Sequence, residues 1–135
     1  MAGVRDLDQL LSDMAPRRAP GTYVCTTAPG APPPGVTPFA TVREDEGLTL
    51  VLLREDADRV GLSYDLPTAR ITLLVHSDLA AVGLTAAVSA ALTAVGISCN
   101  VLAGFHHDHL FVPEDRADDA LDALLALTAG AFRGD

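Results

Sequence analysis

The sequence contains no lysine. Its nine basic residues are all arginine and stand against 18 acidic residues, so the formal net charge of the 135-residue chain is −9. Without lysine the chain cannot form a pyridoxal-phosphate or aldolase-type Schiff base, and it lacks the lysine of a Walker A loop or of a kinase nucleotide site. The acidic balance also counts against general binding to nucleic acid, because contacts to phosphates depend on clustered cationic charge.

Cysteine and long apolar runs are also scarce. Cys25 and Cys99 are far apart and form no CxxC motif, so we expect reduced, buried thiols, although two cysteines still permit a disulfide. Met1–Leu11 is charged and lacks the apolar run of a signal peptide. Leu79–Val95 approaches the length of a membrane span, but its polar face and its glycines favour a buried helix. We expect a cytoplasmic protein without a membrane partner.

The apolar fraction of 49% is enough for a core, and the length fits one compact domain or two very small ones. Apolar periodicity and turn residues predict the elements. The expected strands are Thr22–Thr27, Phe39–Arg43, Leu48–Leu53, Arg70–His76, Ile97–Leu102 and Asp108–Val112. The expected helices are Val4–Met14, Arg54–Val60, one that Ser77 or Asp78 caps and Gly96 ends, and one from Pro113 to about Leu127.

Two helices in the second half should bury one stripe each. The residues expected to face the core are Leu84, Val88, Ala91 and Val95 in the first helix, and Leu121, Leu124 and Leu125 in the second. The Pro- and Gly-rich stretch Ala28–Pro38 predicts a stiff connecting loop, with a flap over a pocket as the alternative.

The order strand–helix–strand–strand–helix in the second half indicates an α+β fold, a ferredoxin-like split βαβ unit without its last strand. Such a unit leaves a sheet edge open, which is costly. The N-terminal segment offers a helix and a strand, so we expect it to complete the second sheet or to form a swapped version of the same fold. We therefore predict two halves, 1–65 and 66–135, that share a core, because separate halves of this size would be marginally stable.

The segment Val82–Val112 resembles the ACT domain, a small ligand-binding module of amino-acid metabolism. The residues that carry the resemblance are Gly83, Ala91-Leu92, Gly96-Ile97-Ser98 and Asp108-His109-Leu110-Phe111-Val112-Pro113. Phe39–Glu55 is also similar to the N-terminal half of stand-alone bacterial ACT-containing proteins. The resemblance implies tandem ferredoxin-like βαββαβ sandwiches, a homodimer, no cofactor and no catalysis, with a small ligand such as an amino acid bound near the loop between the first strand and the first helix.

Candidate ligand contacts follow from this resemblance. They are His76, Ser77, Asp78, Leu79 and Gly83 around the start of the helix, with Asn100, Asp108 and His109 on the following strands. Free backbone N–H groups at a helix start can hold a carboxylate, and Asp78 suits an ammonium, so a zwitterionic amino acid would satisfy both. Asn100 could equally be a solvent-facing polar residue. Val82-Gly83 stands where the ligand loop usually has Pro-Gly.

Two other readings stay open. The cluster His106–His109 places His107 and His109 on one face of a strand, where two imidazoles could ligate a metal, although such a site needs three or four ligands. A protein-interaction module without a ligand is the other alternative. We find no nucleophile arrangement and no paired carboxylates that predict an enzyme.

Overall fold

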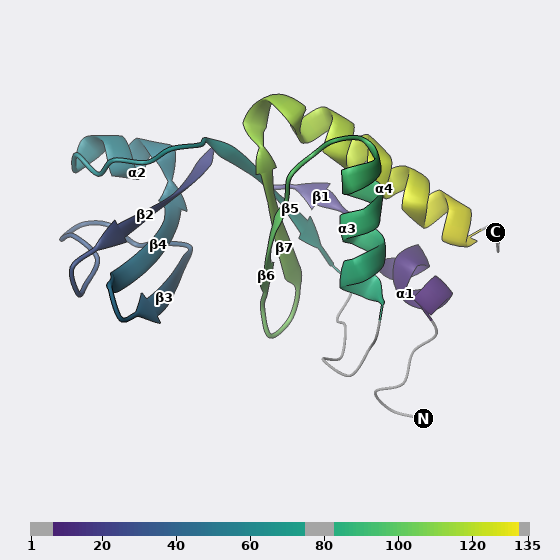
Figure 1. Cartoon of the computed structure of the whole chain (residues 1–135), viewed down its shortest axis with the longest axis horizontal. Helices are drawn as coiled ribbons and strands as arrows, with labels where there is room; N and C mark the ends of the chain where they lie inside the picture. Colours follow the sequence, from purple (N-terminus) through teal and green to yellow (C-terminus); the bar gives the residue numbers. More distant parts are fainter. Residues whose placement is uncertain (1–6, 75–82, 133–135) are drawn as a thin grey trace.

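The computed structural model describes residues 7–74 and 83–132 (Figure 1). The helices are α1 (Leu7–Asp13), α2 (Arg54–Arg59), α3 (Leu84–Ala94) and α4 (Ala117–Phe132), and a 3₁₀ turn, η1 (Glu114–Arg116), precedes α4. The strands are β1 (Arg17–Arg18), β2 (Tyr23–Ala28), β3 (Ala40–Glu44), β4 (Gly47–Leu53), β5 (Thr68–Leu73), β6 (Asn100–Ala103) and β7 (Asp108–Pro113). Across these ranges, no helix has the length and apolarity needed to cross a membrane.

All paired strands are antiparallel and belong to one sheet in the order β3-β4-β2-β5-β7-β6. The link between β2 and β5 is a single residue pair, Tyr23 with Thr68, and β1 pairs with β5 farther along. The sheet therefore divides into two lobes joined at the start of β5 (Figure 1). We call β2, β3, β4 and α2 the N-terminal lobe, and α1, β1, β5, β6, β7, α3 and α4 the C-terminal lobe.

The C-terminal lobe is completed by the N-terminal segment, as the sequence predicts. Its strands lie in the order β1-β5-β7-β6, so β1 takes the place beside the first strand that the last strand has in a βαββαβ unit. Helix α1 packs on α4 and α3, and it brings Leu10, Leu11 and Met14 into the same buried cluster as Ile71, Leu92 and Leu124. The predicted sharing of a core thus occurs through α1.

The N-terminal lobe has a smaller cluster of its own. Alternate residues of β4, namely Leu48, Leu50 and Leu52, are buried with Val24 of β2 and Ala57 of α2. The Pro-rich loop between β2 and β3 contributes the buried side chain of Val36 to this cluster, which makes it a packed connector. In a βαββαβ order, this loop takes the place of the first helix. The start of β5 takes the place of the last strand.

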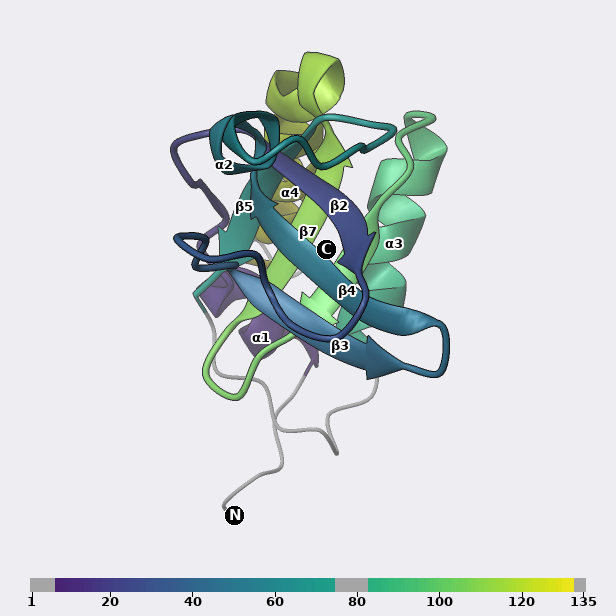
Figure 2. The ribbon, with the colours of Figure 1, turned by 90° about the vertical axis from the view of Figure 1, so that its left-hand side faces the viewer.

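The C-terminal part of the sheet has its helices on one face. Ala69, Ile71 and Leu73 of β5 and Leu110 and Val112 of β7 point to this face and are buried under α1, α3 and α4. In Figure 2 the N-terminal lobe stands in front of β5 and β7, with α3 and α4 behind. The other face of β5 and β7 is therefore turned toward the N-terminal lobe, and it carries most of the polar side chains considered below.

Several predicted boundaries of the second half are wrong. Pro113 does not open a helix: it is the last residue of β7, and α4 begins only at Ala117 after the η1 turn. Leu125 is 46% exposed, because Ala117, Ala120 and Leu124 form the buried stripe of α4. The strand predicted from Ile97 begins at Asn100, since the Ile97 amide donates to the Leu92 carbonyl and closes the end of α3.

Helix α3 differs from its prediction in its start and in the second half of its buried stripe, where Leu92 is buried in place of Ala91 and Val95. It begins at Leu84 with Gly83 at the N-cap, and the expected caps Ser77 and Asp78 lie outside the described residues. Its buried residues are Leu84, Val88 and Leu92, whereas Val95 is 46% exposed because it follows the last helical turn. Gly96 does end the helix in a left-handed conformation with φ of 74°, as predicted.

Candidate functional site

The predicted ligand residues fall on both sides of the sheet. Gly83 lies at the N-cap of α3, and Asp108, which is only 8% exposed, points to the same helix-covered face at the start of β7. Asp108 and the first two residues of α3, Leu84 and Thr85, border one small hollow. The structure thus brings Gly83 and Asp108 to one end of the C-terminal lobe. His76, Ser77, Asp78 and Leu79 lie outside the described residues.

Asn100 and His109 lie on the opposite face, toward the N-terminal lobe. The register pairs Asn100 with Phe111 and Phe111 with Arg70, so these three side chains form one row across β6, β7 and β5. The next row on this face is Leu102, His109 and Thr72. Six side chains from three strands are therefore presented together, and only two of them were predicted as contacts.

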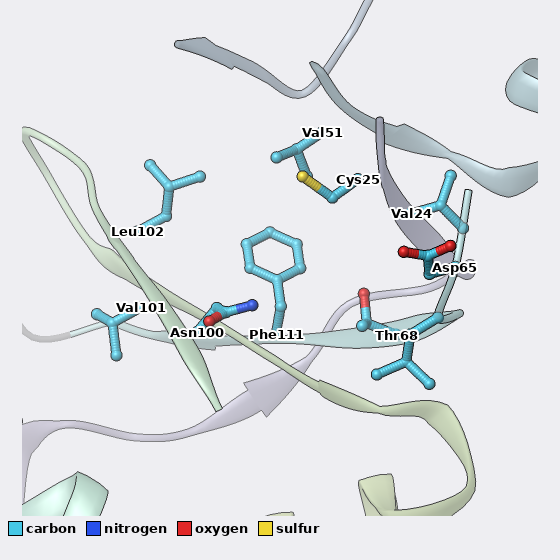
Figure 3. Close-up of a pocket in the computed structure, with 10 residues that line it drawn as sticks. Val24, Cys25, Val51, Asp65, Thr68, Asn100, Val101, Leu102 and Phe111 are labelled. Atoms are coloured by element: carbon cyan, nitrogen blue, oxygen red, sulfur yellow. The ribbon is translucent and has the colours of Figure 1, made fainter. Parts of the chain in front are cut away.

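An interlobe cleft of about 440 Å³ lies beside the first row (Figure 3). Its lining residues are Val24, Cys25, Val51, Asp65, Leu66, Thr68, Asn100, Val101, Leu102 and Phe111. The Phe111 ring stands in the middle of the cleft, with Cys25 and Val51 on one side and Asn100 on the other. The volume is that of a small-molecule site, and the lining combines an apolar floor with a few polar groups, as such sites do.

The polar groups of the cleft have distinct chemical capacities. Asp65 is exposed and brings the one carboxylate of the lining, which can accept from an ammonium group. Asn100 is also exposed and offers both an amide donor and an amide acceptor. The Thr68 hydroxyl donates to the Tyr23 carbonyl at 2.8 Å, which ties the two lobes together at this point.

Cys25 is exposed in the cleft, which corrects the expectation that both thiols are buried. It alternates with the buried Val24 along β2, so its side chain faces the cleft and not the N-terminal core. Partial burial and the nearby charge of Glu44 raise the pKa of the Cys25 thiol. Cys99 is half-buried, and burial raises its pKa as well, so both free thiols are protonated at neutral pH.

Beside the cleft, Arg70 is enclosed by aromatic rings. Its guanidinium carbon lies 4.3 Å from the centroid of the Phe39 ring and 5.1 Å from that of Tyr23, and both rings pack edge-to-face with Phe111. Nη1 of Arg70 donates to Thr72 Oγ1 at 3.1 Å and lies 3.4 Å from His109 Nδ1. Nη2 donates to the Tyr23 hydroxyl at 3.3 Å.

His109 belongs to this cluster around Arg70. Burial lowers the pKa of His109, and the charges of Arg70 and His107 lower it further, against an opposing effect of Asp108. His106 is exposed in the hairpin turn, and β7 begins only after His107. Over the described ranges, no three His, Cys, Asp or Glu side chains come close enough to hold a metal ion.

Comparison with known proteins identifies the family. Two sequence profiles of the ACT domain match the chain, one over residues 2–69 and the other over residues 67–126. The chain belongs to the ACT-domain family. The two matches meet where β5 begins, the strand that links the lobes, and none of the curated proteins matches this ACT-domain chain.

Solved structures support the same fold. A Vibrio cholerae protein, described as of unknown function and a possible transport protein, is 45% identical, with a TM-score of 0.83 over 94% of this chain and 99% of that one. An Agrobacterium tumefaciens protein is 22% identical, with a TM-score of 0.65 over 80% and 84%. The ligand-free regulatory subunit of aspartate kinase from Thermus thermophilus is 10% identical, with a TM-score of 0.59 over 83% and 95%.

Sequence reasoning missed the residues that the N-terminal lobe brings to this face. Tyr23, Phe39 and Asp65 are distant in sequence from Asn100 and Phe111, and only the pairing of strands that are far apart in the chain brings them near. A local signal for Arg70 and Thr72 did exist. They alternate with Ile71 and Leu73 in the predicted strand, so they had to share the face away from the helices.

Proposed function

We propose that this ACT-domain protein is a non-catalytic regulatory protein that binds a free amino acid in the interlobe cleft. The observation that carries the proposal is the cleft itself, which opens where two ACT modules meet and joins an apolar floor to a carboxylate and an amide. The fold shared with the Thermus thermophilus aspartate kinase regulatory subunit supports a regulatory role.

The lining suits each part of an amino acid. Asp65 would accept from the ammonium group, and the Asn100 amide would donate to the carboxylate. An apolar side chain would lie against the ring of Phe111, with Leu102 close by. Because a single residue pair joins β2 of one lobe to β5 of the other, a ligand that touches both lobes would favour one of their relative orientations, and a partner protein could sense that change.

The start of α3 is a second location for the same ligand. Gly83 and Asp108 border it, and the sequence places His76, Ser77, Asp78 and Leu79 directly before it. The two locations differ in a testable way, because Cys25 lines the cleft and lies on the other face of the sheet from Asp108.

A catalytic role has less support. Both thiols have raised pKa values, which disfavours the thiolate that a cysteine nucleophile needs. His109 is held by Arg70 and Thr72, and no serine, threonine or cysteine of the cleft lining pairs with it in the part of the chain that the structure describes.

The test combines stability with protection of a thiol. Purified Cys99→Ala protein is screened by thermal shift against the twenty amino acids, and each hit is added before Cys25 is labelled with a thiol reagent. A ligand at 100 times its dissociation constant stabilises the fold by about 2.7 kcal/mol. A ligand in the cleft should slow labelling in proportion to its occupancy, whereas one at the start of α3 should stabilise the fold without that effect.

Asp65→Asn provides the discriminating variant. It removes the charge that would bind the ammonium group and should weaken the binding of the stabilising amino acid at least tenfold. Asp45→Asn in the β3–β4 turn is the matched control and should leave the affinity unchanged. A screen in which no amino acid stabilises the protein would reject amino-acid binding and favour the interaction module.

The expected homodimer is a further part of this proposal. The sheet ends in β3 on one side and in β6 on the other, and these edge strands expose Val42 and Val101. Unpaired edges favour association with another strand. Sedimentation equilibrium should show a mass of two chains, and Val42→Lys or Val101→Lys should reduce it to one if that edge forms the interface. We place the protein in the cytoplasm, without nucleic-acid or membrane partners.

A further inference from the structure

Arg70 differs from the other arginines in its surroundings. Four described arginines lie near a carboxylate oxygen: Arg18 near Asp118 at 3.5 Å, Arg54 near Glu114 at 3.9 Å, Arg59 near Asp56 at 2.8 Å and Arg116 near Asp119 at 3.1 Å. Arg70 is more enclosed than Arg59, yet within residues 7–74 and 83–132 it forms no ion pair with a carboxylate. A charge held away from water without a counter-charge is unfavourable. The chain has 18 acidic residues, yet none of those described supplies that counter-charge to Arg70.

The groups around Arg70 are neutral and leave part of its guanidinium unsatisfied. Thr72, His109 and Tyr23 take up Nη1 and one hydrogen of Nη2, while Nε is buried and has no hydrogen-bond acceptor in the described structure. An arginine whose Nη1 is occupied can still offer Nε and Nη2 side by side, the arrangement that binds both oxygens of an oxyanion.

A second arginine belongs to the same face of the sheet. Strand β1 pairs Arg17 with Thr72, and residues directly opposite in a strand pair project from the same face of the sheet. Arg17 is exposed and pairs with no carboxylate in the described residues. The Thr72 hydroxyl accepts from Arg70 Nη1 and lies 3.1 Å from His109 Nδ1, and the register places Arg17 opposite Thr72 on β1.

We infer that this face of β5 is an anion site, in which Arg70 and Arg17 bind a carboxylate or phosphate group of a small molecule. The anion supplies the counter-charge that the chain does not. Phe39, which is 37% exposed, covers one face of the guanidinium. The site lies outside the lining of the cleft and does not depend on what the cleft binds.

His109 reports directly on occupancy. Its Nδ1 faces both Arg70 Nη1 and Thr72 Oγ1, so it acts as an acceptor in a neutral ring. The charged groups that act on it are Arg70 on β5, His107 just before its own strand and Asp108 at the start of that strand, while Arg17 lies two strands away in the same row. An anion on Arg70 would offset the positive charge that disfavours protonation, and the pKa of His109 would then rise.

The experiment follows the His109 ring by NMR and the melting temperature by thermal shift, in sodium chloride, sodium acetate and sodium sulfate at equal ionic strength. Acetate probes for a carboxylate and sulfate for a tetrahedral phosphate-like group, and the tighter of the two identifies the ligand class. We expect the better anion to raise the pKa of His109 saturably and to raise the melting temperature by several degrees over chloride. Equal responses in all three salts would overturn the proposal.

Variants separate an anion site from a structural arginine. Arg70→Met keeps the apolar stem and should abolish both responses, while its melting temperature in chloride should not fall, because it removes an uncompensated charge. Arg17 is exposed, so Arg17→Met should fold normally and bind the anion several-fold more weakly. Arg43 on β3 is also exposed, and Arg43→Met is the control that should bind the anion like the wild type. Anion responses that persist in Arg70→Met, or are unchanged in Arg17→Met, would contradict the site.

Discussion

Single residues where the two lobes face each other are held in states that their neighbours determine. Arg70 is stacked against Phe39 and Tyr23, His109 accepts from its neighbours, and Cys25 faces the cleft opposite Phe111. Each of these states depends on a neighbour from another strand. Changing the neighbour should therefore change a measurable pKa or rate at the residue itself.

The first prediction concerns His109 and pH. Because burial and Arg70 lower its pKa in the folded chain, the unfolded chain binds more protons near the usual value of 6.5. The stability that depends on the neutral ring is fully present above the unfolded pKa and is lost as pH falls through the folded one. We expect His109→Gln to lose less unfolding free energy than the wild type between about pH 7 and pH 5, as measured by urea denaturation.

His106→Gln is the control for this effect. His106 lies exposed in the β6–β7 turn, and its replacement should leave the pH dependence of the wild type unchanged. Identical pH dependence in His109→Gln and the wild type would show that the ring titrates alike in the folded and unfolded chains.

The second prediction concerns the reactivity of Cys25. After burial, the charge of Glu44 is the cause that raises the pKa of this thiol, and removing it should increase the thiolate fraction. In a Cys99→Ala background, Glu44→Gln should therefore label faster at pH 8 than the parent. Glu46→Gln, in the same turn, should label at the parental rate, and equal rates for all three would exclude Glu44 as the cause.

The composition of the site follows from the sequence only where neighbours in space are neighbours along the chain. Alternation along the second half correctly separates Asn100 and Phe111 from the helix-facing residues of their strands, and it places Asp108 on the opposite face from His109. It gives no information about Tyr23, Phe39 or Asp65, because these reach the site through the pairing of β2 with β5. The lining of a cleft between two lobes depends on pairings between strands that are distant in the sequence.

At the scale of elements, the local sequence predicts the strands of this chain better than it predicts the ends of the helices. The β3–β4 hairpin, β5 and β7 follow from alternation of apolar residues and from turn residues between them. The start of α4 does not follow from such signals, because a proline such as Pro113 is found both in the first turn of a helix and at the end of a strand. The expectation for Leu125 was wrong because the buried stripe of α4 runs through Ala117, Ala120 and Leu124, and two of these are alanines, which a pattern of larger apolar residues does not include.

The third prediction concerns the start of α3. Gly83 has φ of 102°, and a Cβ there would lie 3.3 Å from Leu7 Cδ2 of α1. Gly83→Ala should therefore lower the unfolding free energy by about 1–2 kcal/mol, mostly from the left-handed backbone. Gly130→Ala in α4, where a Cβ meets nothing within 4 Å, should instead stabilise by up to about 1 kcal/mol. Equal effects of the two variants would contradict this account of Gly83.

At the scale of the whole molecule, the two ACT modules are interlocked. The N-terminal segment supplies α1 and β1 to the C-terminal lobe, and β5 serves both lobes by pairing with β2 at its start. A further link joins the ends of the lobes, where Glu114 accepts from the Thr22 hydroxyl and lies near Arg54. These links, together with the contacts of the Tyr23 and Phe39 rings to Phe111, hold the two lobes on either side of the cleft.

The fourth prediction tests this interlocking through α1. Leu10 is fully buried against the C-terminal core although it lies 60 or more residues from Ile71 in the sequence, whereas Leu125 on α4 is half-exposed. Leu10→Ala should lower the unfolding free energy by about 2–5 kcal/mol, and Leu125→Ala by no more than about 0.5 kcal/mol. If α1 is an integral part of the C-terminal lobe, hydrogen exchange in Leu10→Ala should accelerate across β5, β7 and α4. Acceleration confined to residues 7–18 would mean instead that the segment is an appendage and that the lobe is stable without it.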